Sequence, residues 1–133
     1  MAQMGFYTAT SEFIYYPYNK IFTRINGDDN IFKGMSSFVV EMSELKSILK
    51  YADNRTIVIG DEVCKGTEET SALSIVSASI VNFCVKNVNF IFATHFHKLY
   101  ELSCIKSLKN IRLCHLSVDY DNINDNIIYG RKL

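Results

Sequence analysis

The sequence has few of the residues that mark flexible linkers, with 1 proline and 6 glycines among 133 residues. No stretch rich in glycine, proline or serine divides it, so its length predicts a single domain with its own hydrophobic core. No apolar run comes near the roughly 20 residues that a membrane-spanning helix needs, and the first residues lack the basic start of a signal peptide. We therefore expect an intracellular protein with no membrane partner.

The chain also lacks an excess of charge of either sign. Its 14 lysines and arginines balance 14 aspartates and glutamates, which gives a formal net charge of +0. Proteins that grip nucleic acid do so with clustered cations on their surface. This segment is therefore not expected to be the main DNA-gripping surface, although other parts of a larger protein could contact DNA.

The four cysteines show no C-x-x-C spacing, which argues against a zinc site or a redox motif. Two of them lie inside apolar segments, where a free cysteine behaves as a small hydrophobic residue. We expect Cys64, Cys84, Cys104 and Cys114 to be reduced and to lie in or near the core.

The most informative stretch is an apolar run over residues 56–60 that stops at two adjacent carboxylates, Asp61 and Glu62. An unbroken apolar run is typical of a parallel strand that is buried on both faces. Ligands of open α/β sheets bind just beyond the carboxyl ends of such strands. There the first acid could help to hold Mg²⁺, and the second could orient or deprotonate a water. The alternative is an acidic strand end that only makes turn hydrogen bonds.

A second apolar strand is expected over residues 90–94, and His95 follows it. Residues 70–86 between the two strands have helical spacing, and Asn87 can end that helix in the left-handed conformation. A strand–helix–strand unit makes the strands parallel, so His95 would lie at the same sheet edge as the acid pair. With strands about 4.8 Å apart, the groups would be within roughly 10 Å even across an inserted strand. Alternatively, His95 caps the next helix or is bonded in the core.

Helical spacing also predicts a helix that begins at Ser36 or Ser37, either of which can cap it, and ends near Ala52. The two hydroxyls and the free N–H groups of the first turn would form an anion site. The remaining elements expected from composition are the tail of a helix over 1–7, strands over 14–18 and 20–25, a turn over 26–30, a short helix over 98–103, and an antiparallel strand pair over 111–120 and 127–132.

Four motifs, in this order, resemble the ATPase domain of the MutS family of DNA mismatch-repair proteins. Residues 20–25 are similar to the family segment D-R-I-F-T-R-I/V, and residues 34–42 to G-R-S-T-F-M-V-E-M. Residues 61–67 resemble D-E-I/L-G-R-G-T, and residues 92–97 resemble F-A-T-H-Y/F-F/H. Matching order and intervals make the four together far more specific than any one of them.

The resemblance implies an α/β fold of the ABC-type P-loop NTPase class, with a mainly parallel central sheet flanked by helices and an antiparallel strand pair. Residues 1–133 would form part of that domain, beginning after the phosphate loop and ending before the domain's C-terminus. The implied ligands are ATP and Mg²⁺. By this resemblance Asp61 would hold Mg²⁺ through a water, Glu62 would be the general base, and His95 would contact the γ-phosphate. Ser36 would reach the γ-phosphate bound by a partner subunit, and Ser37 would belong to the same anion site.

Other residues of these motifs are expected to have local roles. Glu41 lies one turn into the signature helix and is expected to accept an internal hydrogen bond, without a catalytic role. Phe22 and Arg24 are expected to be packing and surface residues. His97 follows His95 by two residues, but no third ligand is evident, so we expect no metal site there.

The implied partners are a second MutS-like ATPase domain, in a homodimer or heterodimer, and mismatched double-stranded DNA bound by other domains. ATP turnover would drive a clamp between scanning and sliding states, inside the cell and on DNA. Another ABC-type ATPase, from a chromosome-maintenance or transporter protein, is a weaker interpretation because residues 36–42 do not resemble the signature L-S-G-G-Q.

Several departures from the family pattern qualify this expectation. The phosphate loop G-x-x-x-x-G-K-[ST] does not occur in the chain, so these residues alone are expected to be inactive. Gly60 stands where a larger apolar residue is usual, and Cys64 and Lys65 stand in place of glycine and arginine. Residues 68–72 differ in a loop that communicates across the family's dimer. The alternative is a non-hydrolysing MutS-like dimerisation module or a truncated remnant.

Overall fold

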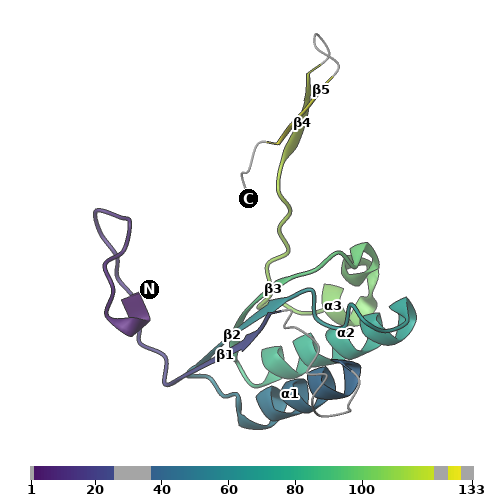
Figure 1. Cartoon of the computed structure of the whole chain (residues 1–133), viewed down its shortest axis with the longest axis horizontal. Coiled ribbons are helices and arrows are strands. Elements are labelled where there is room, and N and C mark those ends of the chain that lie inside the picture. Colours follow the sequence, from purple (N-terminus) through teal and green to yellow (C-terminus); the bar gives the residue numbers. More distant parts are fainter. Residues whose placement is uncertain (1, 26–36, 122–125, 130–133) are drawn as a thin grey trace.

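A computed structural model of the chain describes residues 2–25, 37–121 and 126–129. The elements alternate between strands and helices through the body of the molecule (Figure 1). In chain order they are η1 (Ala2–Met4), β1 (Lys20–Arg24), α1 (Ser37–Tyr51), β2 (Thr56–Asp61), α2 (Glu69–Val85), β3 (Asn89–Ala93), η3 (His97–Glu101), α3 (Ser103–Lys106), β4 (Val118–Asp121) and β5 (Asn126–Tyr129).

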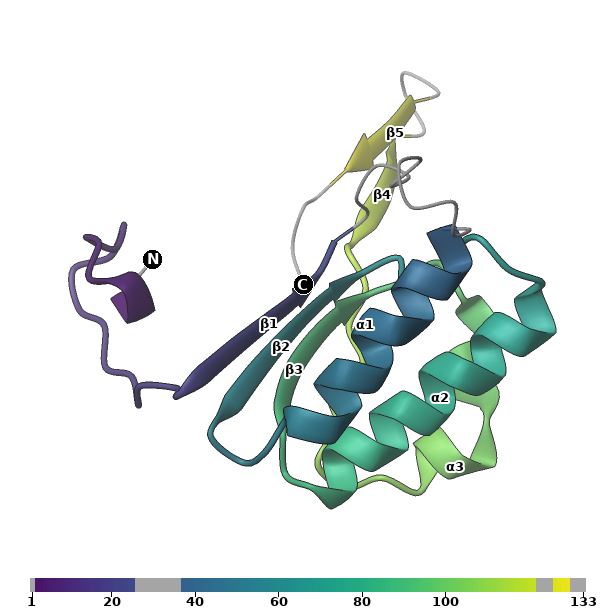
Figure 2. The same ribbon diagram turned by 60° about the horizontal axis from the view of Figure 1, so that its bottom comes forward.

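The body of the molecule is a three-stranded parallel sheet in the order β1-β2-β3. Its register pairs Ile21 with Ile57 and Ile59 with Ile91. Helices α1, α2 and α3 lie on one side of this sheet (Figure 2). The expected α/β architecture, with a parallel sheet flanked by helices, is thereby confirmed.

The opposite face of the sheet differs from the expectation that the central strands are buried on both faces. Along β2, Thr56 and Val58 point toward the helices and are buried, whereas Ile59 on the other face is 36% exposed. On β3, Ile91 is 64% exposed. The expectation is wrong for the described residues, because an apolar run shows that a strand could be covered on both faces but does not supply the second layer.

Phe83 of α2 is the centre of the contact between the helices and the sheet, and it is completely buried. Its ring centroid lies 5.7 Å from that of Phe90 and 5.9 Å from that of Phe92, both on β3. The tilted and edge-to-face arrangements are those that aromatic rings prefer, because the positive ring edge meets the negative face. This cluster holds α2 against the strand that leads to His95.

The C-terminal end of α2 confirms the role expected for Asn87. Asn87 adopts a positive φ of 54°, and its N–H donates to the carbonyl of Cys84 at 3.2 Å. The N–H of Val88 donates to the carbonyl of Phe83 at 2.9 Å. This pair of bonds is a Schellman motif, which satisfies carbonyls at the helix end and turns the chain into β3.

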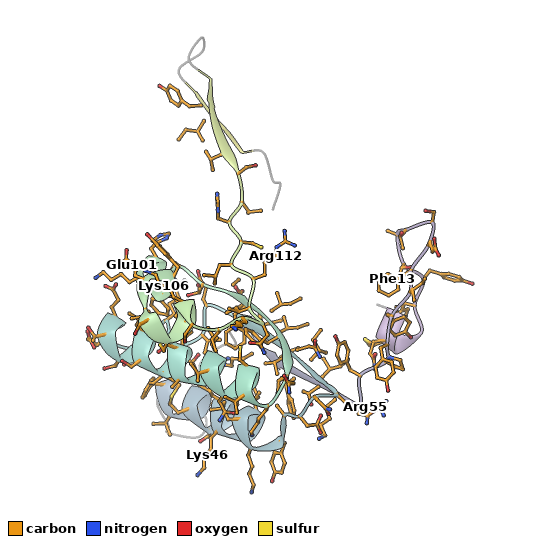
Figure 3. The ribbon with its side chains drawn as sticks, turned by 180° about the vertical axis from the view of Figure 1, so that it is seen from behind. Phe13, Lys46, Arg55, Glu101, Lys106 and Arg112 are labelled. Atoms are coloured by element: carbon orange, nitrogen blue, oxygen red, sulfur yellow. The ribbon has the colours of Figure 1, made fainter. Side chains whose placement is uncertain are left out.

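Residues 14–18, expected as a strand, do not form one. The backbone N–H of Tyr18 donates to Oε1 of Gln3 at 2.9 Å, and the Tyr18 carbonyl accepts from Nε2 of the same side chain. A side chain of the N-terminal segment therefore takes the place of a neighbouring strand. Phe13 lies in this segment, near η1 and away from Lys46 of α1 and Lys106 of α3 (Figure 3). The strand expected over 20–25 is confirmed as β1, and the expected turn over 26–30 lies outside the described residues.

Strands β4 and β5 pair with each other antiparallel, in a ladder separate from the parallel sheet. Val118 pairs with Tyr129, and Asp121 with Asn126. The ladder has 4 residues in each strand, so the first strand is shorter than the predicted range 111–120, and residues 130–132 of the second predicted strand lie outside the described residues. Figure 1 shows it projecting away from the helices.

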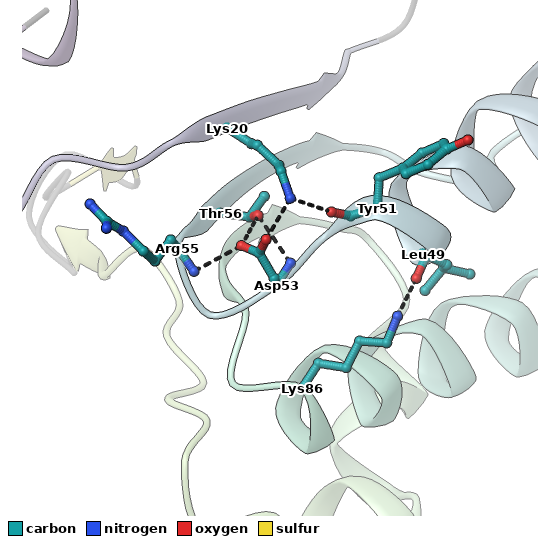
Figure 4. A network of polar contacts seen from close by, with 7 residues as sticks. All are labelled: Lys20, Leu49, Tyr51, Asp53, Arg55, Thr56 and Lys86. Carbon is teal, nitrogen blue, oxygen red and sulfur yellow. Dashed lines mark hydrogen bonds and ion pairs between the residues drawn. The ribbon is translucent and has the colours of Figure 1, made fainter.

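Asp53 organises the turn between α1 and β2 (Figure 4). Its carboxylate forms an ion pair with Lys20 of β1, and it accepts hydrogen bonds from the Thr56 hydroxyl at 2.8 Å and the Arg55 N–H at 3.0 Å. Lys20 also donates to the carbonyl of Tyr51 at 3.1 Å. One lysine thus joins the first strand to the end of the first helix.

The contacts of Asp53 predict a pH dependence of stability. The bond with Lys20, followed by those from Thr56 and Arg55, lowers the pKa of Asp53 from its ordinary 3.8 to about 2. A lowered pKa means that the stabilisation is complete above the ordinary pKa and is lost as the pH falls through about 2. Urea unfolding should show the unmodified chain losing stability more steeply than Asp53→Asn between about pH 4 and pH 2. Equal slopes would contradict this assignment.

Gly60 of β2 leaves space for the ring of Phe92. A Cβ atom at this position would lie 2.7 Å from both Cδ1 and Cε1 of that ring. We expect Gly60→Ala to lower the free energy of unfolding by about 1–3 kcal/mol, because the core must shift to relieve the overlap. The double variant Gly60→Ala/Phe92→Leu should cost less than the sum of the single changes. Additive effects in urea unfolding would show that the two residues do not compete for this space.

Candidate functional site

The carboxyl ends of β2 and β3 bring the acid pair and the histidine together. Asp61 lies opposite Ala93 in the ladder, and the N–H of Glu62 donates to the Ala93 carbonyl at 3.0 Å. Two residues farther along, His95 places Nδ1 4.0 Å from Oε1 of Glu62. Strands β2 and β3 are direct neighbours, so Glu62 and His95 are closer than the roughly 10 Å expected across an inserted strand. Asp61 is half-buried at the same edge.

The backbone after Asp61 turns sharply through two residues with positive φ. Glu62 has φ of 47° and Cys64 has φ of 66°. Residues other than glycine in this left-handed region cost of order 1–3 kcal/mol each and often mark functional sites. Cys64 occupies the position where the resembling motif has glycine. The positive φ explains why glycine suits this position, since glycine adopts it without strain. Its buried side chain packs in the core, and this burial offsets part of the cost.

Lys65 forms an ion pair with the second carboxylate oxygen of Glu62. The hydrogen bond to Glu62, reinforced by its charge, raises the pKa of Lys65 above the ordinary value. One oxygen of Glu62 thus faces an ammonium group and the other faces the His95 ring. The Glu62 side chain is 33% exposed, so the carboxylate remains open to solvent.

His95 itself neither lies in the core nor caps the next helical turn. Its side chain is 51% exposed, and its ring packs 4.6 Å from the ring of buried Phe96. Phe96 precedes η3, and no side chain makes a capping hydrogen bond there. Phe96 therefore anchors this segment, and His95 is left facing the edge of the sheet.

Glu41 of α1 joins the helix to the loop that carries the acid pair. Its side chain is 6% exposed, and Oε1 accepts the Cys64 N–H at 2.8 Å. The same oxygen lies 3.4 Å from Nε of Arg24, whose side chain is 14% exposed. The prediction that Glu41 accepts an internal hydrogen bond is confirmed.

The prediction for Arg24 as a surface or packing residue missed its ion pair. The signal was the position of Glu41, which shares a helical stripe with Leu45 and Ile48, both buried. A carboxylate in an apolar stripe needs an ionic or hydrogen-bonding partner. Of the two serines predicted to form an anion site, Ser37 is the first residue of α1, and Ser36 lies outside the described residues.

Residues 68–72, which depart from the resembling motif, have a local function. Glu68 precedes α2 and accepts hydrogen bonds from the N–H groups of Thr70 and Ser71, each at 2.8 Å. These bonds, that from Thr70 first, lower the pKa of Glu68 to about 2. Glu68 is thus the N-cap of the helix that follows the acid-pair loop.

The described residues supply at most a small part of a metal shell at this edge. Within residues 2–25, 37–121 and 126–129, no group of three or more His, Cys, Asp or Glu side chains is placed to hold a metal. Mg²⁺ usually takes one or two carboxylates, with waters and phosphates completing its shell. Half-buried Asp61 at the sheet edge offers one such carboxylate.

The four cysteines are free, but only two of them are buried. Cys64 and Cys84 lie in the core, whereas Cys104 and Cys114 are exposed. The expectation that all four lie in or near the core is wrong: in α3 the buried residue is Ile105, whereas the neighbouring Cys104 is exposed, and Cys114 lies exposed outside the helices and strands. In the part of the chain that the structure describes, no helix combines the length and apolarity needed to cross a membrane.

Fold and site together define an α/β protein with an acid pair and a histidine at the carboxyl edge of a parallel sheet. The family model for MutS domain V matches residues 1–133. The chain therefore belongs to the MutS family.

Relatives of this chain carry the same family name. It is 47% identical over 136 residues to a mutS homologue of Acanthamoeba polyphaga mimivirus, with all of the chain covered. It is 38% identical over 133 residues to the mitochondrial DNA mismatch repair protein mutS homologue of Sarcophyton glaucum, again over the whole chain. It is 44% identical over 117 residues, 86% of the chain, to the DNA mismatch repair protein MutS of Finegoldia magna. The chain spans 12% of the first relative and 13% of the other two.

Burial predicts two classes of thiol. Desolvation, followed by the nearby charge of Glu41, raises the pKa of Cys64 to about 11, and burial also raises the pKa of Cys84. Because thiolates are the reactive form, we expect Cys104 and Cys114 to react rapidly with Ellman's reagent near neutral pH. Cys64 and Cys84 should react only slowly until urea unfolds the chain. Mass spectrometry of labelled peptides checks this, and rapid labelling of Cys64 in the folded chain would contradict it.

Proposed function

We propose that this chain is part of the ATP-hydrolysing domain of a MutS-like DNA mismatch repair protein with a P-loop NTPase fold. The observation that carries the proposal is the approach of Glu62 and His95 to 4.0 Å beside Asp61. Hydrolysis of ATP needs an oriented water and charge stabilisation around the γ-phosphate. The site offers one carboxylate to bind Mg²⁺, a second carboxylate to orient the water, and an imidazole to contact the γ-phosphate.

Each of these side chains has a defined role in the proposal. Asp61 would hold Mg²⁺, and the ion would neutralise charge on the phosphates. The Glu62 carboxylate accepts a proton from the attacking water, whose oxygen bonds to the γ-phosphorus while the bond to the leaving ADP oxygen breaks. His95 donates a hydrogen bond to a γ-phosphate oxygen. Lys65 forms an ion pair with the other oxygen of Glu62.

The proposal places hydrolysis in a protein where this chain is joined to a phosphate loop, since no G-x-x-x-x-G-K-[ST] occurs within it. Ser36 and Ser37 would contact the ATP of a second MutS-like domain. ATP turnover would then be coupled to the binding of mismatched double-stranded DNA by other domains, inside the cell. The family match and the relatives named for mismatch repair support this wider role.

A second candidate is a MutS-like dimerisation module that does not hydrolyse ATP. One observation favours it: Lys65 already engages a carboxylate oxygen of Glu62. If the ammonium group does not leave, that oxygen cannot accept a proton from water.

Loss of the Glu62 carboxylate distinguishes the two candidates. In the complete gene product that contains these residues, Glu62→Ala should lower the rate of ATP turnover at least about tenfold, because a general base contributes this much or more. Glu101→Ala is the matched control: it removes one acidic charge from an exposed residue of η3, and such surface substitutions usually have little effect. Phosphate release under saturating Mg·ATP is the measurement. Unchanged turnover in Glu62→Ala would overturn the role of Glu62 as general base, whereas no turnover in the unmodified protein would favour the non-hydrolysing module.

A further inference from the structure

A buried carboxylate that no proposed catalytic step uses lies directly behind the acid pair. Glu41 is on α1, and its partner Cys64 is 23 residues away in the loop after β2. The hydrogen bond between them, 2.8 Å from Oε1 to the backbone nitrogen, is buried. Such a bond is both strong and costly to break, since the dry surroundings offer no replacement donor or acceptor.

This hydrogen bond acts on the part of the loop whose conformation is least favourable by itself. Glu62 and Cys64 both have positive φ, and Val63 between them is buried. Strained backbone persists only where surrounding contacts determine it. On one side the Ala93 carbonyl holds the Glu62 N–H, and on the other side Glu41 holds the Cys64 N–H. These two bonds bracket the turn that presents the Glu62 side chain.

We propose that Glu41 is a positioning residue for Glu62, which it holds in reach of His95 through the Cys64 N–H. The inference rests on the proposed ATPase function and adds to it a residue that touches neither nucleotide nor water. It also gives a physical link between α1, whose first residue is Ser37, and the acid pair.

The ion pair with Arg24 offers a competing explanation of why a carboxylate lies here. Nε of Arg24 is 3.4 Å from Glu41, but it is also 3.4 Å from Oε2 of Glu44, so Arg24 keeps an acidic partner without Glu41. The two explanations require different properties of Glu41. Positioning requires that residue 41 carry an acceptor long enough to reach the Cys64 N–H, whereas pairing with Arg24 requires only a negative charge.

Two substitutions separate reach from charge. Glu41→Gln keeps an oxygen acceptor at the same reach and removes the charge, whereas Glu41→Asp keeps the charge but is shorter by about 1.5 Å, one carbon–carbon bond. In the complete gene product, we expect Glu41→Asp to lower kcat at least about tenfold with KM for ATP nearly unchanged, since an error of about 1 Å in position can cost that much. Glu41→Gln should stay within about threefold of the unmodified kcat. Glu44→Gln, which loses the other contact with Arg24, is the control and should have unmodified kcat.

Amide hydrogen exchange at Cys64 supplies a readout that does not depend on activity. Exchange should be faster in Glu41→Asp and remain slow in Glu41→Gln. If Glu41→Asp does not fold, Glu41→Met fills a similar volume without an acceptor and should show the same loss of kcat and of protection.

Each outcome separates the inference from the proposed function. Full kcat and slow exchange in Glu41→Asp, or equal losses in Glu41→Asp and Glu41→Gln, would overturn the positioning role while the ATPase assignment stands. Absence of ATP turnover in the unmodified protein would overturn the ATPase assignment. Amide hydrogen exchange at Cys64 would then be the only test of whether Glu41 fixes the conformation of the loop.

Discussion

The parallel pairing of β2 with β3 is the constraint on which the rest of the structure depends. It aligns Asp61 with Ala93, and the bond from the Glu62 N–H to that residue's carbonyl extends the pairing by one residue. Because parallel strands end at the same sheet edge, two polar segments 33 residues apart meet without a dedicated contact between their loops. A shift of one residue in this register would turn the side chains to the opposite face.

The packing of α2 keeps that register in place. Phe83 contacts the rings of both Phe90 and Phe92, so the helix bears on two residues of one strand face. Gly60 leaves the space into which the Phe92 ring fits, and a side chain there would collide with it. The departure from a larger apolar residue before the acid pair therefore has a structural reason in this chain. This layer of side chains covers one face of the sheet only, and residues on the opposite face, such as Ile91, are exposed.

Much of the body of the molecule could be predicted because its signals are local. The helical spacing before Asn87 and the apolar runs before Glu62 and His95 specify elements through neighbouring residues alone, and α2, β2 and β3 form within a residue or two of the expected bounds. The prediction failed over residues 14–18, where β-forming composition had no strand to pair with and Gln3 bonded the backbone instead. The prediction that Cys104 and Cys114 are buried failed for a related reason. Burial depends on which segment packs against a residue, and composition does not specify this.

The sequence alone determined the order of the motifs and the polar residues that follow the two apolar strands, since each of these features depends on a few adjacent side chains. Family membership, the parallel sheet and the candidate site at its edge followed from them. Folding in three dimensions decided how the groups are held. The 4.0 Å approach of His95 to Glu62 and the buried hydrogen bond from the Cys64 N–H to Glu41 join residues that are far apart in the sequence. Such contacts between distant segments exist only once the helices have packed on the sheet, because no local pattern encodes which segment will lie opposite another.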